Sequence, residues 1–250
     1  MKILSMVLLS MGGSTVLGVL CGLCVRRISH KWHDAVLGFA AGVMLAAAVL
    51  GLLEPAFGDA GNLMLPVAGT VAGAGLISLL DRLVPHLHRI AGLDTEEHRA
   101  NGSISKTLLF VAAIALHKIP EGLATGVSFG AEETGDIVMV AAAMSLQNIP
   151  EAFVIVAPVF MLGVRARRVV LLSCAIAGIS MVSVVAGFAL VSVFSSAVAF
   201  LLAMAGGAML YVISDEMIPE SHAHGFEKPA TFSLIAGFLL VMVLQSWLMP

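Results

Sequence analysis

The sequence has few charged residues: Asp, Glu, Lys and Arg make up 12% of its 250 residues, against roughly 25% in an average soluble domain. Apolar residues account for 59%, and the mean hydropathy is +1.03. This balance excludes an ordinary globular enzyme and indicates a chain that crosses a lipid bilayer many times. The sequence has no basic tract for nucleic acid, so we expect no nucleic-acid partner.

Cysteine is also scarce. Cys21, Cys24 and Cys174 all lie in apolar stretches and give no even-numbered disulfide framework. Cys21-x-x-Cys24 has a spacing that metal ligands use, but packing of two small residues is the better interpretation. The sequence contains no ATP-binding motif, no His-Glu-x-x-His motif and no sizeable soluble domain, which argues against a pump, a zinc protease and a metal-sensing receptor.

Eight apolar stretches are long enough to cross a bilayer as helices, which takes about 20 residues each. Small residues recur in them at helical spacing, as at Gly38 and Gly42 or Gly69 and Gly73, which allows helices to pack closely. The sequence therefore predicts an all-α, polytopic membrane protein with one transmembrane domain over residues 1–250. The predicted spans are 3–25, 35–54, 62–84, 105–129, 134–162, 169–192, 195–217 and 230–249.

Basic residues lie on one side of this predicted topology. The loops after the first, third, fifth and seventh spans, together with the span ends that border them, hold 11 of the 13 Lys and Arg residues, and the opposite loops hold none. Because basic loops remain in the cytoplasm, we expect both termini on the extracytoplasmic side of the cell (inner or plasma) membrane. The cytoplasmic loop 85–104 contains histidines and is either a solvated linker or a metal-holding segment.

Two similar polar motifs interrupt the fourth and fifth spans. They are Ala115-Leu-His-Lys-Ile-Pro-Glu-Gly122 and Leu146-Gln-Asn-Ile-Pro-Glu-Ala152. Residues four apart share a helix face, which pairs His117 with Glu121 and Gln147 with Glu151. Each proline removes a backbone hydrogen bond, so we expect a kink and a free carbonyl beside each cluster.

These polar groups describe a cradle for a divalent metal ion. Ionisable side chains deep in a membrane are costly and are functional candidates by default. A structural Lys118–Glu121 pair alone leaves the other polar residues unexplained. Imidazole suits zinc, iron and nickel, and carboxylate and amide oxygens extend the range to manganese. The predicted metal ligands are His117, Glu121, Gln147, Asn148 and Glu151, with Met44 a weak candidate on composition alone because the chain has 14 methionines.

Acidic residues and histidines also follow the third and seventh spans. In the predicted topology they meet at one cytoplasmic mouth, where they form either a low-affinity metal exit or ordinary interfacial charge. These residues are Asp81, His86, His88, Asp215, Glu216, Glu220, His222 and His224.

The pattern favours a transporter over an enzyme. Paired, proline-interrupted helices point to a transporter's binding site. Entry of a dication into a negative-inside cell is downhill by about 4.6 kcal/mol per 100 mV, so no ATP is required. We expect no enzymatic activity and no catalytic cofactor. The alternative is an intramembrane metal-dependent hydrolase, which usually needs three metal ligands and a base.

At these residues the chain resembles the ZIP family of divalent metal transporters, of the prokaryotic type. The two Pro-Glu motifs resemble that family's fourth and fifth helices, Asp215-Glu-Met-Ile-Pro-Glu its seventh and Gly38 to Met44 its second. The resemblance implies uptake of zinc, and also of iron, manganese or cadmium, into the cytoplasm. It further implies an inverted-repeat bundle around kinked helices 4 and 5, Met44 as a further ligand, and frequently a homodimer.

The chain departs from that family at three places. Lys118 stands where Asn commonly follows the His, Asn148 where Asp often follows the Gln, and Ile179-Ser-Met-Val182 where some members carry a Glu. Members with two metal ions use these positions for the second ion. We therefore expect a single-metal site in which Lys118 substitutes electrostatically for the second cation.

Overall fold

The computed structural model describes residues 2–25, 28–58, 61–83, 117–131, 134–161 and 164–248, and within them it contains helices and no β-strand. Besides a helical segment over 117–127, the α-helices are α1 Lys2–Val25, α2 His30–Ala48, α3 Glu54–Gly58, α4 Met64–Leu83, α7 Thr134–Met161, α8 Ala166–Val193, α9 Val198–Val212, α10 Ile218–Ser221 and α11 Glu227–Leu248.

The predicted all-α membrane fold is confirmed. Among the described residues, six helices are long and apolar enough to cross a membrane, and α4 is a shorter apolar helix. Every predicted span contains described helix, although residues 105–116 of the fourth span and the loop 85–104 lie outside the described residues. The single-domain boundaries stay a prediction.

Two pairs of helices continue into each other through π-helical turns. α2 passes through Val49–Leu53 into α3, and α9 passes through Ile213–Met217 into α10. The helix predicted over 35–54 extends over 30–58. Its first turn is polar and lies before the apolar stretch, and its other end continues through the π turn into α3. Single π turns inside helices often mark functional sites, and Ile213–Met217 contains two of the predicted acidic residues.

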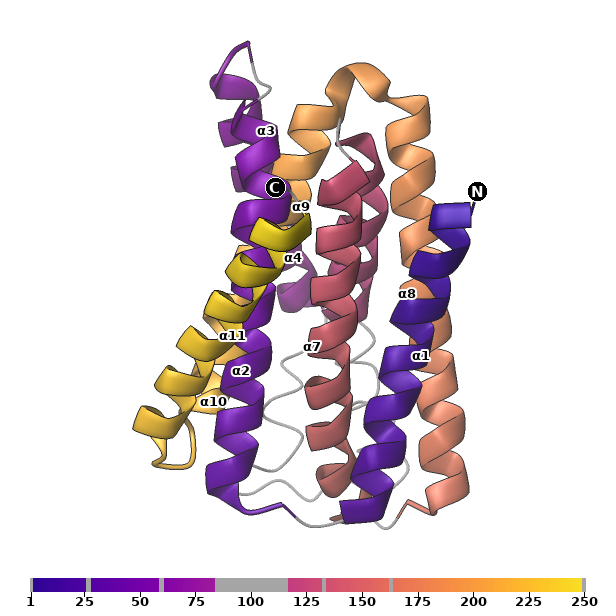
Figure 1. Cartoon of the computed structure of the whole chain (residues 1–250), viewed down its shortest axis with the longest axis vertical. Coiled ribbons are helices and arrows are strands. Elements are labelled where there is room, and N and C mark those ends of the chain that lie inside the picture. Colours follow the sequence, from indigo (N-terminus) through magenta and orange to yellow (C-terminus); the bar gives the residue numbers. More distant parts are fainter. Residues whose placement is uncertain are drawn as a thin grey trace.

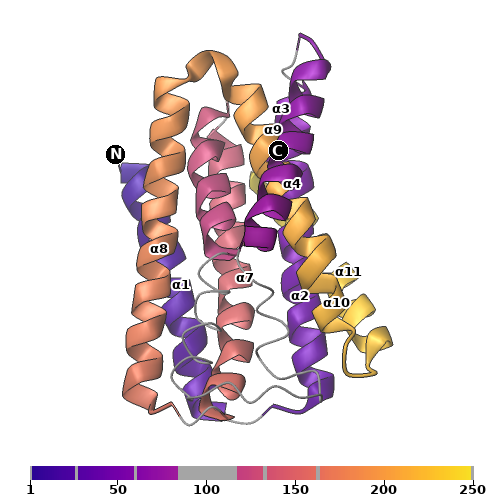
Figure 2. The same cartoon turned by 180° about the vertical axis from the view of Figure 1, so that it is seen from behind.

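The helix α7 lies in the middle of the bundle (Figure 1). It packs against α1 and α2, while α11 packs on α2, α8 on α1 and α9 on α4 (Figures 1 and 2). The predicted close packing at glycines is confirmed: a Cβ added at Gly42 would lie 1.9 Å from Leu234 O, and one at Gly73 would lie 1.9 Å from Met204 O.

Exposed basic residues gather at one end of the bundle. The starts of α2, α8 and α11 all lie toward the lower end in Figure 1, whereas α3 and the turn between α8 and α9 lie at the upper end. We call the lower end the basic end, after its exposed residues Lys31, Arg165, Arg167, Arg168 and Lys228. The structure thus groups these five basic residues at one end, whereas the exposed Lys2 starts α1 toward the other end and Lys118 is buried.

Candidate metal centre

The two Pro-Glu motifs lie on helices that are surrounded by other helices. Segment 117–127 packs closely on α8, since a Cβ added at Gly126 would lie 2.1 Å from Val184 O. The second motif lies near the middle of α7, which stays helical across Pro150. The kinks expected at the two prolines stay predictions. The surrounding helices bury the polar side chains that the motifs carry.

Lys118 joins the two motifs. Its Nζ donates hydrogen bonds to Glu121 Oε2 at 2.6 Å, to Asn148 Oδ1 at 2.8 Å and to Glu151 Oε2 at 2.5 Å. The side chain is buried, with 1% of the residue exposed. An ammonium group has three protons, and these contacts engage all three. The structure therefore brings four of the predicted site residues together, with the cation between the two carboxylates.

Glu216 joins this centre from a third element. It lies in the π turn Ile213–Met217, is buried, and its Oε2 contacts Nε2 of His117. The sequence places Glu216 with the exit residues because its neighbours follow the seventh span. In the structure it approaches the first motif instead. A π turn adds a residue to the helical repeat and so changes which side chain faces inward.

Gln147 and Met44 are both fully buried. Neither Oε1 nor Nε2 of Gln147 has a hydrogen-bond partner among the described residues. Buried amides are nearly always hydrogen-bonded, so an unpartnered amide beside Asn148 suits a site that receives a ligand. Met44 lies on α2, which packs against α7, and takes no part in the hydrogen bonds of Lys118.

The other predicted exit residues do not form one cluster within the described part of the chain. Asp215 is exposed and Glu220 is half-buried. His222 contacts Ile218 O at 2.8 Å and Ser221 Oγ at 2.9 Å through Nδ1, and Thr231 Oγ1 at 3.1 Å through Nε2. The side chain of Asp81 in α4, and His86 and His88, lie outside the described residues.

His224 instead contacts a residue that sequence reasoning missed. Its Nδ1 lies 2.7 Å from Oδ1 of Asp34, in the second turn of α2. His33, next to Asp34, was also missed. Both stand just before the apolar stretch, where polar residues are ordinary at a membrane boundary. The available signal was the pattern His30-x-x-His33-Asp34, which places three candidate ligands near one helix start.

Comparison with known proteins identifies the family of the chain. The family model described as ZIP Zinc transporter matches residues 88–245, which include both motifs and the π turn with Glu216. The chain is also 37% identical to "Zinc transporter ZIPB" of Bordetella bronchiseptica, over 93% of this chain and 77% of that protein. The chain belongs to the ZIP zinc transporter family. This membership confirms the resemblance seen in the motifs.

Further members of the ZIP family match over similar lengths. "Zinc transporter GufA" of Myxococcus xanthus is 37% identical over 94% of each chain, and "Zinc transporter ZupT" of Corynebacterium aurimucosum is 31% identical over 96% of this chain and 94% of that protein. The matches and the apolar helices identify the chain as a multi-pass membrane protein of a family of divalent metal transporters.

Proposed function

We propose that this protein carries divalent metal ions, zinc above all, into the cytoplasm through one metal site between segment 117–127 and α7. His117, Glu121, Gln147 and Glu151 are the proposed ligands, with Asn148 at their edge and Met44 as a further soft ligand from α2. Lys118 takes the place of a second cation. The names of the relatives support zinc as the cargo, and the ligand chemistry extends the proposal to iron, manganese and cadmium.

The contacts of the Lys118 ammonium are the observation that carries this proposal. With Glu121, Glu151 and Glu216 ionised and His117 neutral, the ammonium leaves the centre two formal negative charges, which attract a dication. One bound dication brings the formal charge to 0, and a second would bring it to +2. Like charges in a buried, low-dielectric site repel strongly. The cluster therefore favours one ion.

Several acceptor groups remain for that ion. Lys118 contacts only the Oε2 atoms of Glu121 and Glu151, so it engages neither Oε1 atom. The Gln147 amide adds an oxygen without a described partner, and His117 adds an imidazole held beside Glu216. A mixed nitrogen and oxygen set without thiolates binds zinc less tightly than a structural thiolate cage. Such a set suits an ion that must be released.

The direction of transport follows from the distribution of charge. The basic end is the proposed cytoplasmic side, which places both termini on the extracytoplasmic side of the plasma or inner membrane. A dication moving toward a negative interior gains about 4.6 kcal/mol per 100 mV, so the membrane potential drives uptake. Glu216, between the metal centre and the turn after α10, is the proposed first residue of the exit. We further propose that the protein works as a homodimer.

Uptake into sealed proteoliposomes with a zinc-sensitive dye inside tests this function. We expect time-dependent zinc entry in the wild type, stimulated by an inside-negative potential and abolished in Glu121→Ala. Glu227→Ala removes an exposed carboxylate at the start of α11 and serves as the matched control. Wild-type protein that binds zinc at the centre without letting it enter would contradict transport and favour the hydrolase alternative.

A further inference from the structure

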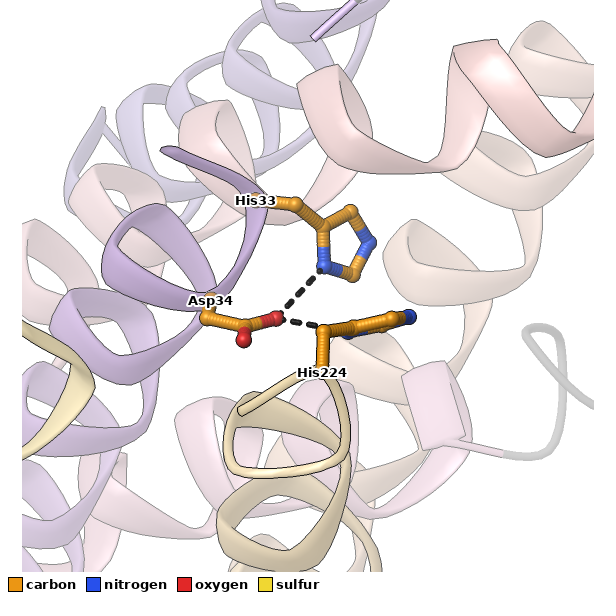
Figure 3. Close-up of side chains that lie close together, drawn as sticks. All are labelled: His33, Asp34 and His224. Carbon is orange, nitrogen blue, oxygen red and sulfur yellow. Dashed lines mark hydrogen bonds and ion pairs between the residues drawn. The ribbon is translucent and has the colours of Figure 1, made fainter. Parts of the chain in front are cut away.

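A second group of metal-ligating side chains lies outside the proposed transport centre. Asp34 Oδ1 lies 2.7 Å from Nδ1 of His224 and 3.4 Å from Nδ1 of His33. Figure 3 shows both contacts meeting at the same oxygen of the carboxylate, with the two imidazole rings packed edge to face. One ligand atom from each of the three residues can be chosen so that all lie within 4.8 Å of one another. We call these three residues the α2-start cluster.

Two packed elements bring this cluster together. His33 and Asp34 belong to the first turns of α2, and His224 lies 190 residues further along the chain, in the turn between α10 and α11. That turn includes Gly225 with φ +83, a left-handed conformation that glycine adopts without strain. α11 then packs along α2, where a Cβ at Gly38 would lie 2.5 Å from Ala230 O. This packing holds the turn against the start of α2.

The described protein groups satisfy only one of the two carboxylate oxygens of Asp34. Asp34 is 0% exposed, and its Oδ2 has no hydrogen-bond partner among the described residues. A hydrogen-bonded His–Asp–His group with a purely structural role would leave this buried acceptor without a described partner, which is unfavourable for a charged group. A cation bound to the carboxylate would satisfy it. The Oδ2 atom without a described partner therefore points to a bound cation, which the hydrogen bonds of Oδ1 alone would not indicate.

The donor set selects the kind of cation. Two imidazoles and one carboxylate suit zinc, cobalt or nickel, whereas magnesium and calcium prefer sets made of oxygen. The side chains of His33 and His224 are 13% and 21% exposed, so an ion can reach them from solvent. Three protein ligands leave one tetrahedral position for water. The set thus suits an exchangeable ion rather than a permanently held one.

The cluster is separate from the transport centre. Met44 comes ten residues after Asp34 in α2, which corresponds to about 15 Å along a helix. Asp34 lies toward the basic end, where α2 begins (Figure 1). The two sites are therefore too far apart to share one ion.

We propose that His33, Asp34 and His224 form a second metal site, which binds a zinc-like divalent cation and links the start of α2 to the turn before α11. The binding itself does not depend on transport. Its assignment as a site that receives ions on the cytoplasmic side rests on the proposed function. An ion there would join elements that come from opposite ends of the chain.

Zinc titration of the full-length protein in detergent, followed by calorimetry, tests the site. The titration uses wild type and Glu121→Ala, in which the transport centre is disabled. We expect Glu121→Ala to retain one zinc ion per chain. Adding Asp34→Asn or His224→Gln to Glu121→Ala should weaken the binding of that zinc ion at least about 10-fold. Loss of a residue that only supports a metal ligand already costs about 10-fold, so loss of a ligand should cost no less. A large excess of magnesium should not displace the zinc. With Co²⁺ as probe, the same variants should lose the visible absorption of the bound ion.

His222→Gln is the discriminating variant, because His222 lies two residues from His224 but faces Ile218 O and Thr231. We expect it to bind zinc as its parent does. The proposal would be overturned if His224→Gln bound zinc as tightly as its parent, Glu121→Ala. It would also be overturned if His222→Gln, and not His224→Gln, lost zinc affinity. Since His224 lies in a turn, its substitution leaves helix packing in place. Zinc bound here by a protein that fails to transport in liposomes would leave this site standing and refute only the transport function.

Discussion

The two buried acidic clusters differ in the cation that accompanies them. Around Lys118, an ammonium group already contacts both carboxylates. Around Asp34, the partners among the described residues are imidazoles, and one carboxylate oxygen has no described partner. An imidazole can release its proton and accept a metal on the same nitrogen, whereas an ammonium has no lone pair to offer. In our proposals, the first cluster therefore limits the number of bound ions, and the second leaves its cation position to a metal.

The largest effect is expected from Glu151→Ala. This change removes a proposed ligand and lowers the formal negative charge of the centre from two to one, so a dication is attracted less strongly. We expect the initial rate of zinc uptake into proteoliposomes to fall at least about 100-fold, the upper end of what residues outside the ligand shell contribute. The control Glu227→Ala should transport as the wild type does. Retained uptake in Glu151→Ala would mean that α7 supplies no essential ligand.

Lys118→Asn should turn the first cluster into one that accepts a second ion. The substitution removes the ammonium and adds an amide oxygen, so two bound dications bring the formal charge of the centre to +1 instead of +2. We expect metal analysis of the purified protein to find one more zinc ion per chain than in the wild type. Lys228→Asn, which alters an exposed lysine of α11, should leave the count unchanged. An unchanged count in Lys118→Asn would show that the ammonium does not exclude the second ion.

Gly42→Ala should affect the two clusters differently, because the α2-start cluster depends more on the packing of α11 against α2. The new Cβ would lie 1.9 Å from Leu234 O, so α2 and α11 must move apart, at a cost of about 1–3 kcal/mol in stability. We expect a lower thermal midpoint and weaker zinc binding at the α2-start cluster, with less change at the Lys118 cluster. Gly178→Ala, where an added Cβ meets nothing within 4 Å, is the control. Equal weakening of both sites would argue against this coupling.

The smallest effect is expected from Met44→Leu. Leucine conserves the volume of this fully buried side chain and removes only its thioether, a soft ligand. We expect zinc uptake to fall by a few-fold at most, and cadmium uptake, which favours soft ligands, to fall further. Competition between the two metals in proteoliposomes measures the ratio. If the zinc-to-cadmium ratio stays at the wild-type value, Met44 is a packing residue only.

Local sequence rules predicted the Lys118 cluster because its geometry is mostly helical. The three-residue spacing of Lys118 and Glu121 places them on one face, and the repeated Pro-Glu motif indicated that two helices meet. The contact of His117 with Glu216 was not predictable in the same way, because it depends on a π turn that shifts the helical repeat. Nor was the contact of Asp34 with His224, which depends on how α11 packs back onto α2 after 190 residues of chain.

The zinc content of the Lys118 cluster, located by anomalous scattering in crystals of the zinc-loaded wild type, tests the single-ion site most directly. We predict one zinc ion bound by His117, Glu121, Gln147 and Glu151, with Lys118 Nζ still between the carboxylates. Two zinc ions about 3.5–4 Å apart, the spacing of two-metal sites, with Lys118 displaced from Glu121 and Glu151, would contradict it.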